Sequence, residues 1–448
     1  MTNNKNQSSL YSQLVQQLLP GLTVSFVAIS LGAAFGVLSG RGALAGILSA
    51  GVIALITAAF GGTRIQCSGP TAPMTAVTIL LVSAVGGGLL ADHPDVDPDR
   101  FINLVLLLTG AMLIVASLLR LGRFIKLIPK IVISGFMNGI ALLIWVGEFC
   151  SIFGIGGKTA YLGNVFVNLA IVLLTLSVIF TLPLLLRKVS DRLNSFFPAT
   201  LIAIVVVSTL SNLFGLDVQH VSLGGSIESL TDIKGMIVGQ LPTEWSLALL
   251  ILAAPFVVQL AMLAYLDTLL TSLVVDRKVE IMHGRQDPTK PNQELCAQGI
   301  ANAAVSVFGG IPGAQATIRS VLILNEGATM RLAGVLVGIF VLIEMLMFQD
   351  LISLIPQAVF SGVLLKVGYD VFDWMPVRQY ISQLLQPSPA QLPPVGHSGM
   401  ALIAGTALLT VLVNLSVAVI VFTIIFYLAR KFCGIEDIKT ESAMHDEG

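Results

Sequence analysis

Long apolar stretches alternate with short polar segments along almost the whole chain. A helix that crosses a bilayer needs about 20 mostly apolar residues, and many of these stretches approach that length. The pattern predicts an all-α polytopic membrane protein with fourteen transmembrane segments. We place them at 20–38, 43–60, 70–90, 101–119, 131–147, 165–186, 198–214, 246–275, 295–308, 312–325, 332–349, 351–366 and at two places within 401–430.

The composition supports a membrane protein and excludes several other classes. Of the 448 residues, 55% are hydrophobic and 11% charged, whereas about 25% are charged in an ordinary soluble domain. A net charge of −1 offers no basic surface for nucleic acid. The chain has no HExxH or GxSxG motif, its four cysteines form no CxxC pair, and its histidines fall outside the predicted spans. We therefore expect neither an enzyme nor a bound cofactor, and no metal beyond a transported or coupling ion.

The charges between the spans predict the orientation of the chain. Segments 120–130, 187–192 and 277–290 are rich in Lys and Arg, whereas 91–100 and 215–244 are mainly acidic. Basic loops face the cytoplasm, and the number of spans between these loops has the required parity. The sequence thus predicts an integral, multi-pass protein of the plasma (inner) membrane with both termini in the cytoplasm.

Two stretches in different halves of the chain resemble each other. AFGGTRIQCSGPTAPMTAV (59–77) and VFGGIPGAQATIRSVLI (307–323) each pass from a Phe-Gly-Gly turn through Gly, Pro and Thr into a helical pattern. Interrupted segments at matching places are typical of inverted repeats with a substrate site at mid-membrane. Two half-helices that begin there would offer unpaired N–H groups to an anion. A pair of ordinary kinked packing helices remains the alternative.

A few charged residues fall inside the predicted spans, where each is costly. Asp267 lies within the longest span, and Thr271 shares its helical face at i+4. The two could bind Na⁺, Asp267 could carry a proton, or the carboxylate could serve only as an interhelical hydrogen-bond acceptor. Arg319 could face an anion or pair with Asp267. We expect Glu344 at the membrane interface.

Five strings resemble the SulP sulfate-permease family, whose members include animal anion exchangers, prestin and cyanobacterial bicarbonate transporters. The strings occur in the family's order, and the likeness covers residues 15–430. They are SGPTAPMT (68–75), LGRFIKLIPKIVISGFMNGIA (121–141), LDTLLTSLVVD (266–276), NQELCAQGIAN (292–302) and FGGIPGAQATIRS (308–320).

The resemblance implies a fold of seven plus seven inverted segments, divided into a core domain and a gate domain. Most members end in a cytoplasmic STAS domain, for which the residues after Lys431 are too few. The implied division is a cytoplasmic N-terminal segment at 1–19, core at 20–119 and 245–349, gate at 120–214 and 350–431, an extracellular loop at 215–244 and a short cytoplasmic tail at 432–448.

The resemblance also implies the site residues. The anion would lie between the starts of the third and tenth segments, and the coupling ion beside it. The implied anion-binding residues are Thr71, Gln315, Ala316, Thr317 and Arg319, and those for the coupling ion are Asp267, Thr271, Ala316 and Thr317. Two positions depart from the bicarbonate members, which have an acid at the position of Gly69 and a small residue at that of Arg319.

The sequence therefore predicts a secondary active transporter of an inorganic oxyanion, with sulfate favoured over bicarbonate. Coupling to H⁺ or Na⁺ would accompany an elevator-like movement of the core against the gate. An uncoupled anion exchanger or channel-like protein is the first alternative. A nucleobase permease or a non-transport membrane protein is a more distant one. The expected partners are the anion and membrane lipid, with a homodimer left open.

Overall fold

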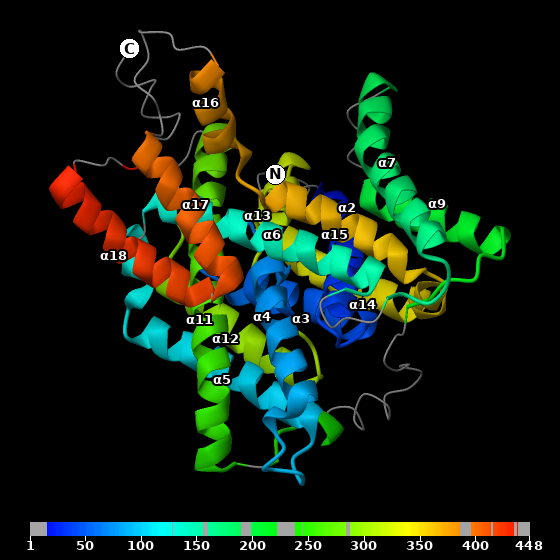
Figure 1. Cartoon of the computed structure of the whole chain (residues 1–448), viewed down its shortest axis with the longest axis horizontal. Helices are drawn as coiled ribbons and strands as arrows, with labels where there is room; N and C mark the ends of the chain where they lie inside the picture. Colours follow the sequence, from blue (N-terminus) through cyan, green and yellow to red (C-terminus); the bar gives the residue numbers. More distant parts are fainter. Residues whose placement is uncertain are drawn as a thin grey trace, which may run out of the picture. The chain divides into compact units, whose positions relative to one another are not determined.

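The computed structural model describes most of the chain, and it is predominantly helical (Figure 1). The described residues are 16–127, 129–155, 160–189, 199–221, 238–243, 245–283, 287–385, 396–413, 415–433 and 437. Parts of the predicted terminal segments and of the predicted loop 215–244 lie outside these ranges.

The helices follow the apolar stretches of the sequence. Among the described residues, eight helices are long and apolar enough to cross a membrane, and two shorter apolar ones follow at Ala199–Leu213 and His397–Leu412. The count of fourteen spans therefore stays a prediction. The α-helices are α2 (Leu18–Leu38), α3 (Ala43–Phe60), α4 (Ala72–Ala84), α5 (Pro98–Leu118), α6 (Lys130–Phe153), α7 (Val165–Val189), α9 (Ala199–Leu213), α11 (Leu247–His283), α12 (Pro291–Val307), α13 (Thr317–Asn325), α14 (Arg331–Ser353), α15 (Gln357–Val371), α16 (Trp374–Leu385), α17 (His397–Leu412) and α18 (Leu415–Cys433).

Two short strands qualify the prediction of an all-α protein. Strand β1 (Ser68–Pro70) precedes α4, and strand β2 (Gly313–Gln315) precedes α13. They pair antiparallel, with Gly69 opposite Ala314. All six strand residues are buried. The pairing gives hydrogen-bond partners to backbone that the interrupted helices leave without a helical ladder, as buried polar groups require.

By density of internal contacts the chain divides into two compact units. Unit 1 comprises Met1–Arg123 and Cys150–Leu364, and unit 2 comprises Phe124–Phe149 and Leu365–Gly448. All the predicted site residues belong to unit 1. The implied division into core and gate domains stays a prediction.

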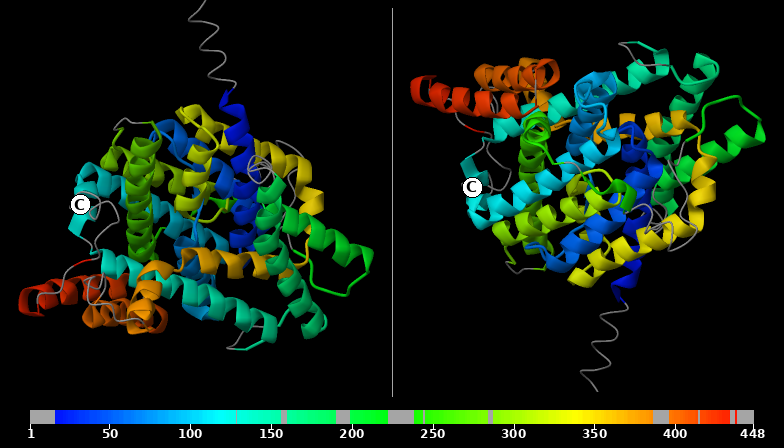
Figure 2. Two further views of the ribbon diagram at one scale, coloured as in Figure 1. Left: turned by 90° about the horizontal axis from the view of Figure 1, so that it is seen from above. Right: turned by 90° about the horizontal axis from the view of Figure 1, so that it is seen from below.

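Within unit 1, small residues let helices approach one another closely. Helices α2 and α3 form an adjacent pair in the blue part of the chain, and α14 packs against both (Figure 2). A Cβ atom at Gly46 of α3 would lie 1.9 Å from the carbonyl oxygen of Gly32 in α2. In the same way Gly110 of α5 packs against Gly299 of α12. Such backbone contacts between small residues are typical of helix packing in membranes.

The long helix α11 reaches both interrupted segments. It contacts α4, α13 and β2, and it also packs along α5 and α12 (Figure 1). Residues on one face of α11 can therefore contribute to a site formed by the starts of α4 and α13.

Candidate functional site

Two half-helices begin beside the strand pair. Thr71 is the N-cap of α4 and Ala316 the N-cap of α13; both are extended, and neither N-cap side chain caps its helix. The ladders start with Thr75 N–H to Thr71 O at 2.9 Å and Ser320 N–H to Ala316 O at 2.9 Å. The backbone N–H groups before these bonds have no partner within their own helix. They provide the donors and partial positive charge expected of an anion site.

Further hydrogen bonds hold the two starts together. The Ala316 N–H donates to the Cys67 carbonyl oxygen at 3.2 Å. The Ser320 hydroxyl accepts from the Cys67 N–H at 3.1 Å and lies 3.3 Å from the Cys67 carbonyl oxygen. With the β1–β2 ladder, these bonds set the separation of the half-helix starts by backbone geometry.

Arg319 extends from α13 to the start of α4. Its side chain is 1% exposed, and Nη2 donates to the Pro70 carbonyl oxygen at 2.8 Å. Within the described part of the chain, Nε and Nη1 have no hydrogen-bond partner. A buried guanidinium with free donors is costly unless a counter-charge accompanies it. Its position between the two half-helix starts suits a bound anion.

Gly69 provides the space that Arg319 occupies. A Cβ atom there would lie 2.8 Å from Nη1 and 3.1 Å from Nη2 of Arg319. The glycine also has a φ of +154°. Gly69 and Arg319, the two positions expected to differ from the bicarbonate members of the family, are thus sterically linked.

We expect Gly69→Ala to displace the Arg319 side chain and lower affinity for the transported anion. The added methyl group is too close to the guanidinium, and the flexible side chain is the part able to move. Loss of one charge-assisted hydrogen bond corresponds to about a tenfold weaker Kd or more. Anion titration of the purified variant tests this. An unchanged Kd in a folded protein would contradict the steric link.

Asp267 comes from α11 to the same place. Its carboxylate has a coulombic interaction with Arg319, and no hydrogen bond joins Thr71 Oγ1 to any described residue. Asp267 Oδ2 likewise lacks a hydrogen-bond partner among them. No Arg319–Asp267 ion pair within 4.0 Å occurs in the described structure. The direct pairing of acid and base considered from sequence is therefore not observed.

The other predicted residues surround this group. The hydroxyls of Thr271 and Thr317 lie 2.6 Å apart. The Gln315 N–H donates to Thr268 Oγ1 at 3.3 Å, while its buried side-chain Nε2 has no hydrogen-bond partner within the described ranges. Ala316 contributes backbone. The structure therefore brings all seven predicted site residues into one neighbourhood of α4, α11, β2 and α13; their roles stay predictions.

A buried polar cluster behind β1 was missed when the sequence was interpreted for site residues. Glu294 of α12 is fully buried and accepts hydrogen bonds from Thr63 N–H at 2.8 Å and Gln66 Nε2 at 2.9 Å. Gln298 Nε2 donates to Ser68 Oγ at 2.7 Å and contacts Glu294 Oε1 at 3.2 Å. The signal was present, because both side chains fall within the string NQELCAQGIAN. Gln298 thus contacts β1 directly, and Glu294 contacts the segment just before it.

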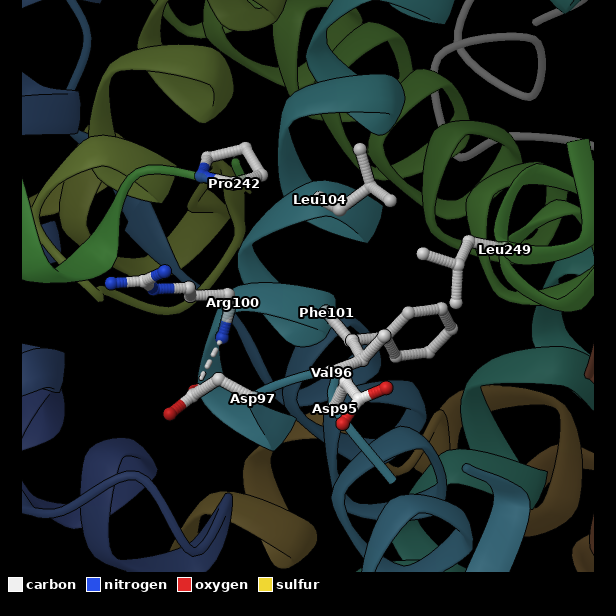
Figure 3. A pocket seen from close by; sticks show the side chains of 8 residues that line it. All are labelled: Asp95, Val96, Asp97, Arg100, Phe101, Leu104, Pro242 and Leu249. Atoms are coloured by element: carbon white, nitrogen blue, oxygen red, sulfur yellow. Dashed lines mark hydrogen bonds between the residues drawn. The ribbon is translucent and has the colours of Figure 1, made fainter. Parts of the chain in front are cut away.

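A small cavity at the acidic loop before α5 has a structural explanation. It measures about 30 Å³ and includes Asp95, Asp97, Arg100 and Pro242 in its lining (Figure 3). Asp97 Oδ1 accepts from the N–H groups of Asp99 and Arg100 at 2.9 and 3.0 Å, so that it caps α5. The cavity has room for about one water molecule, and none of the predicted anion-site residues lines it.

Interrupted helices, a site of opposed half-helix starts and an apolar multi-helix frame together define a membrane transporter. The comparisons with known proteins agree. The model of the sulfate permease family matches residues 14–384. The bicarbonate transporter BicA of Picosynechococcus sp. is 30% identical over 414 residues, covering 89% of this chain and 67% of that protein. The chloroplastic sulfate transporter 4.1 of Arabidopsis thaliana is 24% identical over 384 residues, covering 80% of this chain and 52% of that protein.

The solved transmembrane domain of a cyanobacterial bicarbonate transporter BicA has a similar fold. The TM-score is 0.74 at 29% sequence identity, and the alignment covers 91% of this chain and 97% of that one. The chain thus spans about two thirds of one full-length relative and about half of the other. The chain belongs to the sulfate permease family. It is an integral multi-pass membrane transporter and not an enzyme.

Proposed function

We propose that this protein is a secondary active transporter of an inorganic oxyanion. One observation carries the proposal: the buried guanidinium of Arg319, with two unpaired donor atoms, lies between the starts of α4 and α13. Backbone N–H groups and a planar guanidinium together suit an oxyanion, which accepts several hydrogen bonds at once. Thr71, Gln315, Ala316 and Thr317 complete the proposed binding site.

Among oxyanions we favour sulfate over bicarbonate. The proposed site carries an arginine at 319 and a glycine at 69, and this combination makes it more positive than one with an acid at 69. A more positive site favours a dianion over a monoanion. The relatives' names include both bicarbonate and sulfate transporters, so the choice rests on these two positions.

Asp267 is the proposed coupling group. With Thr271, Thr317 and the backbone at Ala316 it offers the oxygen ligands that Na⁺ takes, and alone it could bind a proton. We favour the proton, because the nearby guanidinium of Arg319 disfavours a second cation. An exchanger needs no titratable or cation-binding acid beside its anion, so the position of Asp267 argues against the uncoupled alternatives. The family strings argue against a nucleobase permease.

The proposed mechanism is alternating access in the plasma (inner) membrane, with both termini in the cytoplasm. The fourteen segments would form a seven-plus-seven inverted repeat, and the core would carry the anion in an elevator-like movement against the gate. The β1–β2 pair supports such a movement, because it lets both half-helix starts travel as one body. A homodimer stays open as the assembly.

Uptake into proteoliposomes tests the proposal. Radiolabelled sulfate and bicarbonate are supplied separately, with the sodium gradient and the pH gradient imposed independently. We expect concentrative sulfate uptake that rises as the external pH falls and does not depend on sodium. Sodium-dependent uptake would show that Na⁺, and not the proton, is the coupling ion. Uptake that requires only an anion on the opposite side would contradict coupling to either ion.

The variant Thr271→Val separates the two coupling ions. The substitution removes an oxygen ligand and the hydrogen bond between the hydroxyls of Thr271 and Thr317. It keeps the Asp267 carboxylate. Proton-driven uptake should persist at a reduced rate, whereas sodium-driven uptake should be lost at ordinary sodium concentrations. The half-saturating sodium concentration and the pH profile of uptake, measured for wild type and variant, distinguish these results.

A further inference from the structure

A second and larger cavity lies in unit 1, away from the proposed anion site. Its volume is about 610 Å³, and its walls come from α2, α9, α14 and the start of α15, with Ile47 of α3. This is within the range of small-molecule sites, about 300–1,000 Å³. Thr71, Asp267 and Arg319 do not line it, so the transport mechanism leaves it without a role.

One wall of this cavity carries a buried carboxylate. Glu344 of α14 lines the cavity and is only 6% exposed. The Ser25 hydroxyl of α2 lies 2.6 Å from Oε1. Oε2 is buried and has no hydrogen-bond partner among the residues that the structure describes. The side chain thus packs between α2 and α14, and the interfacial position expected from the sequence stays a prediction.

A second unpaired polar atom comes from α9. Ser208 lines the cavity, is 7% exposed, and its Oγ has no hydrogen-bond partner in the described ranges. Most of the remaining lining is apolar, as with Phe26, Ile29 and Phe348. Buried polar atoms without partners are costly. Two of them in one apolar cavity indicate a ligand with a polar head and a hydrocarbon body.

The rim of the cavity indicates where such a ligand comes from. Val205 and Leu213 of α9 and Leu351 of α14 line it, yet they are 56%, 75% and 59% exposed. In a multi-pass membrane protein, exposed apolar surface of this kind faces lipid hydrocarbon. A molecule dissolved in the bilayer can therefore enter without crossing water.

We propose that this cavity binds a membrane amphiphile with a primary ammonium head and one alkyl chain inserted among the apolar side chains. The ammonium group would donate hydrogen bonds to Glu344 Oε2 and to Ser208 Oγ. A carboxylate in an apolar surrounding is best stabilised by an opposite charge that also donates hydrogen bonds. The same arrangement favours an ammonium head over a fatty acid, whose carboxylate would repel an ionised Glu344. A long-chain amine and an aminolipid share this chemistry.

Photo-crosslinking of the protein in phosphatidylcholine nanodiscs tests the proposal. The probe is hexadecylamine with a diazirine in its chain; phosphatidylcholine is a suitable background because its head has no N–H donor. We expect crosslinks in peptides 199–213 and 331–353. Hexadecylamine should compete, and palmitate and hexadecanol should compete at least about tenfold less well. Equal competition by palmitate or hexadecanol, or crosslinks mainly in helices that do not line the cavity, would overturn it.

Variants place the ammonium group at Glu344. Glu344→Gln should weaken probe binding about tenfold or more, whereas Asp350→Asn, which removes an exposed acid from the same helix, should leave it unchanged. Val205→Trp should reduce labelling by filling the rim. Unchanged binding in folded Glu344→Gln protein would overturn the proposal. If that variant does not fold, the competition between hexadecylamine and palmitate on wild-type protein decides.

The source of the ligand is tested by lipid composition. Replacing part of the phosphatidylcholine by phosphatidylethanolamine should reduce labelling if an aminolipid occupies the cavity. Unchanged labelling would assign the cavity to free long-chain amines.

Discussion

Asp267→Asn is expected to abolish concentrative uptake while anion exchange persists. The amide keeps the shape of the side chain but can neither titrate nor carry the negative charge that a coupling cation needs. The carboxylate has an unpaired buried oxygen and a coulombic interaction with Arg319, so removing its charge changes the electrostatics of the site. Accumulation of labelled sulfate above its external concentration should fall to background.

The matched control for this prediction is Asp276→Asn. Asp276 lies on the same helix α11, but its oxygens accept hydrogen bonds from the N–H and hydroxyl of Thr289 at 2.9 and 2.7 Å. That substitution should lower stability and leave concentrative uptake intact. Full accumulation by Asp267→Asn would remove the carboxylate from the coupling mechanism, whether H⁺ or Na⁺ is the driving ion.

Arg319→Ala is expected to weaken anion binding by about one to two decades. A hydrogen bond to a charged group contributes about 1.5–3 kcal/mol, which corresponds to this range of affinity. Arg319→Lys should recover only part of the loss, because a single ammonium group cannot donate from a planar fork. Half-saturation of sulfate uptake and direct anion titration both measure the effect.

The control for the arginine is Arg331→Ala. Arg331 is also partly buried in unit 1, and its Nη1 donates to the carbonyl oxygen of Gly61 at 2.7 Å near the end of α3. Its removal should destabilise the protein without a comparable change of anion affinity. If the two variants lose affinity to the same degree, the effect of Arg319 is structural and the proposed contact with the anion fails.

Much of the candidate site was predictable because its residues obey local rules. Gly and Pro are clustered in 59–77 and 307–323, each time between apolar stretches, so both could be recognised as interrupted segments. Asp267 and Thr271 share a helical face by spacing alone, and α11 spans both residues in the structure. The family resemblance then supplied the roles, which composition and periodicity do not contain.

The parts that were missed depend on contacts between distant segments. The β1–β2 pairing joins Ser68 to Gln315, and three-residue strands leave no alternation that a sequence pattern can reveal. Glu294 lies in the first turn of a helix, where an exposed acid is common. Only its contacts with Thr63 and Gln66 show that it is buried. The contact of Glu344 with Ser25 joins two helices, and the sequence neighbours of Glu344 do not reveal it. In each case the partner lies more than 200 positions away.

The strand pair has a consequence for how specificity can change. Adjacent strands lie about 4.8 Å apart, and backbone hydrogen bonds, which do not depend on side-chain identity, hold them there. The distance between the two half-helix starts is therefore constant in any sequence that keeps the pairing, and it limits the size of the ion that fits between them. Substitutions at Thr71, Gln315 or Arg319 can alter charge and hydrogen bonding without changing that distance. A scaffold of this kind can be retuned from one small oxyanion to another, whereas a much larger substrate would require the pairing itself to break.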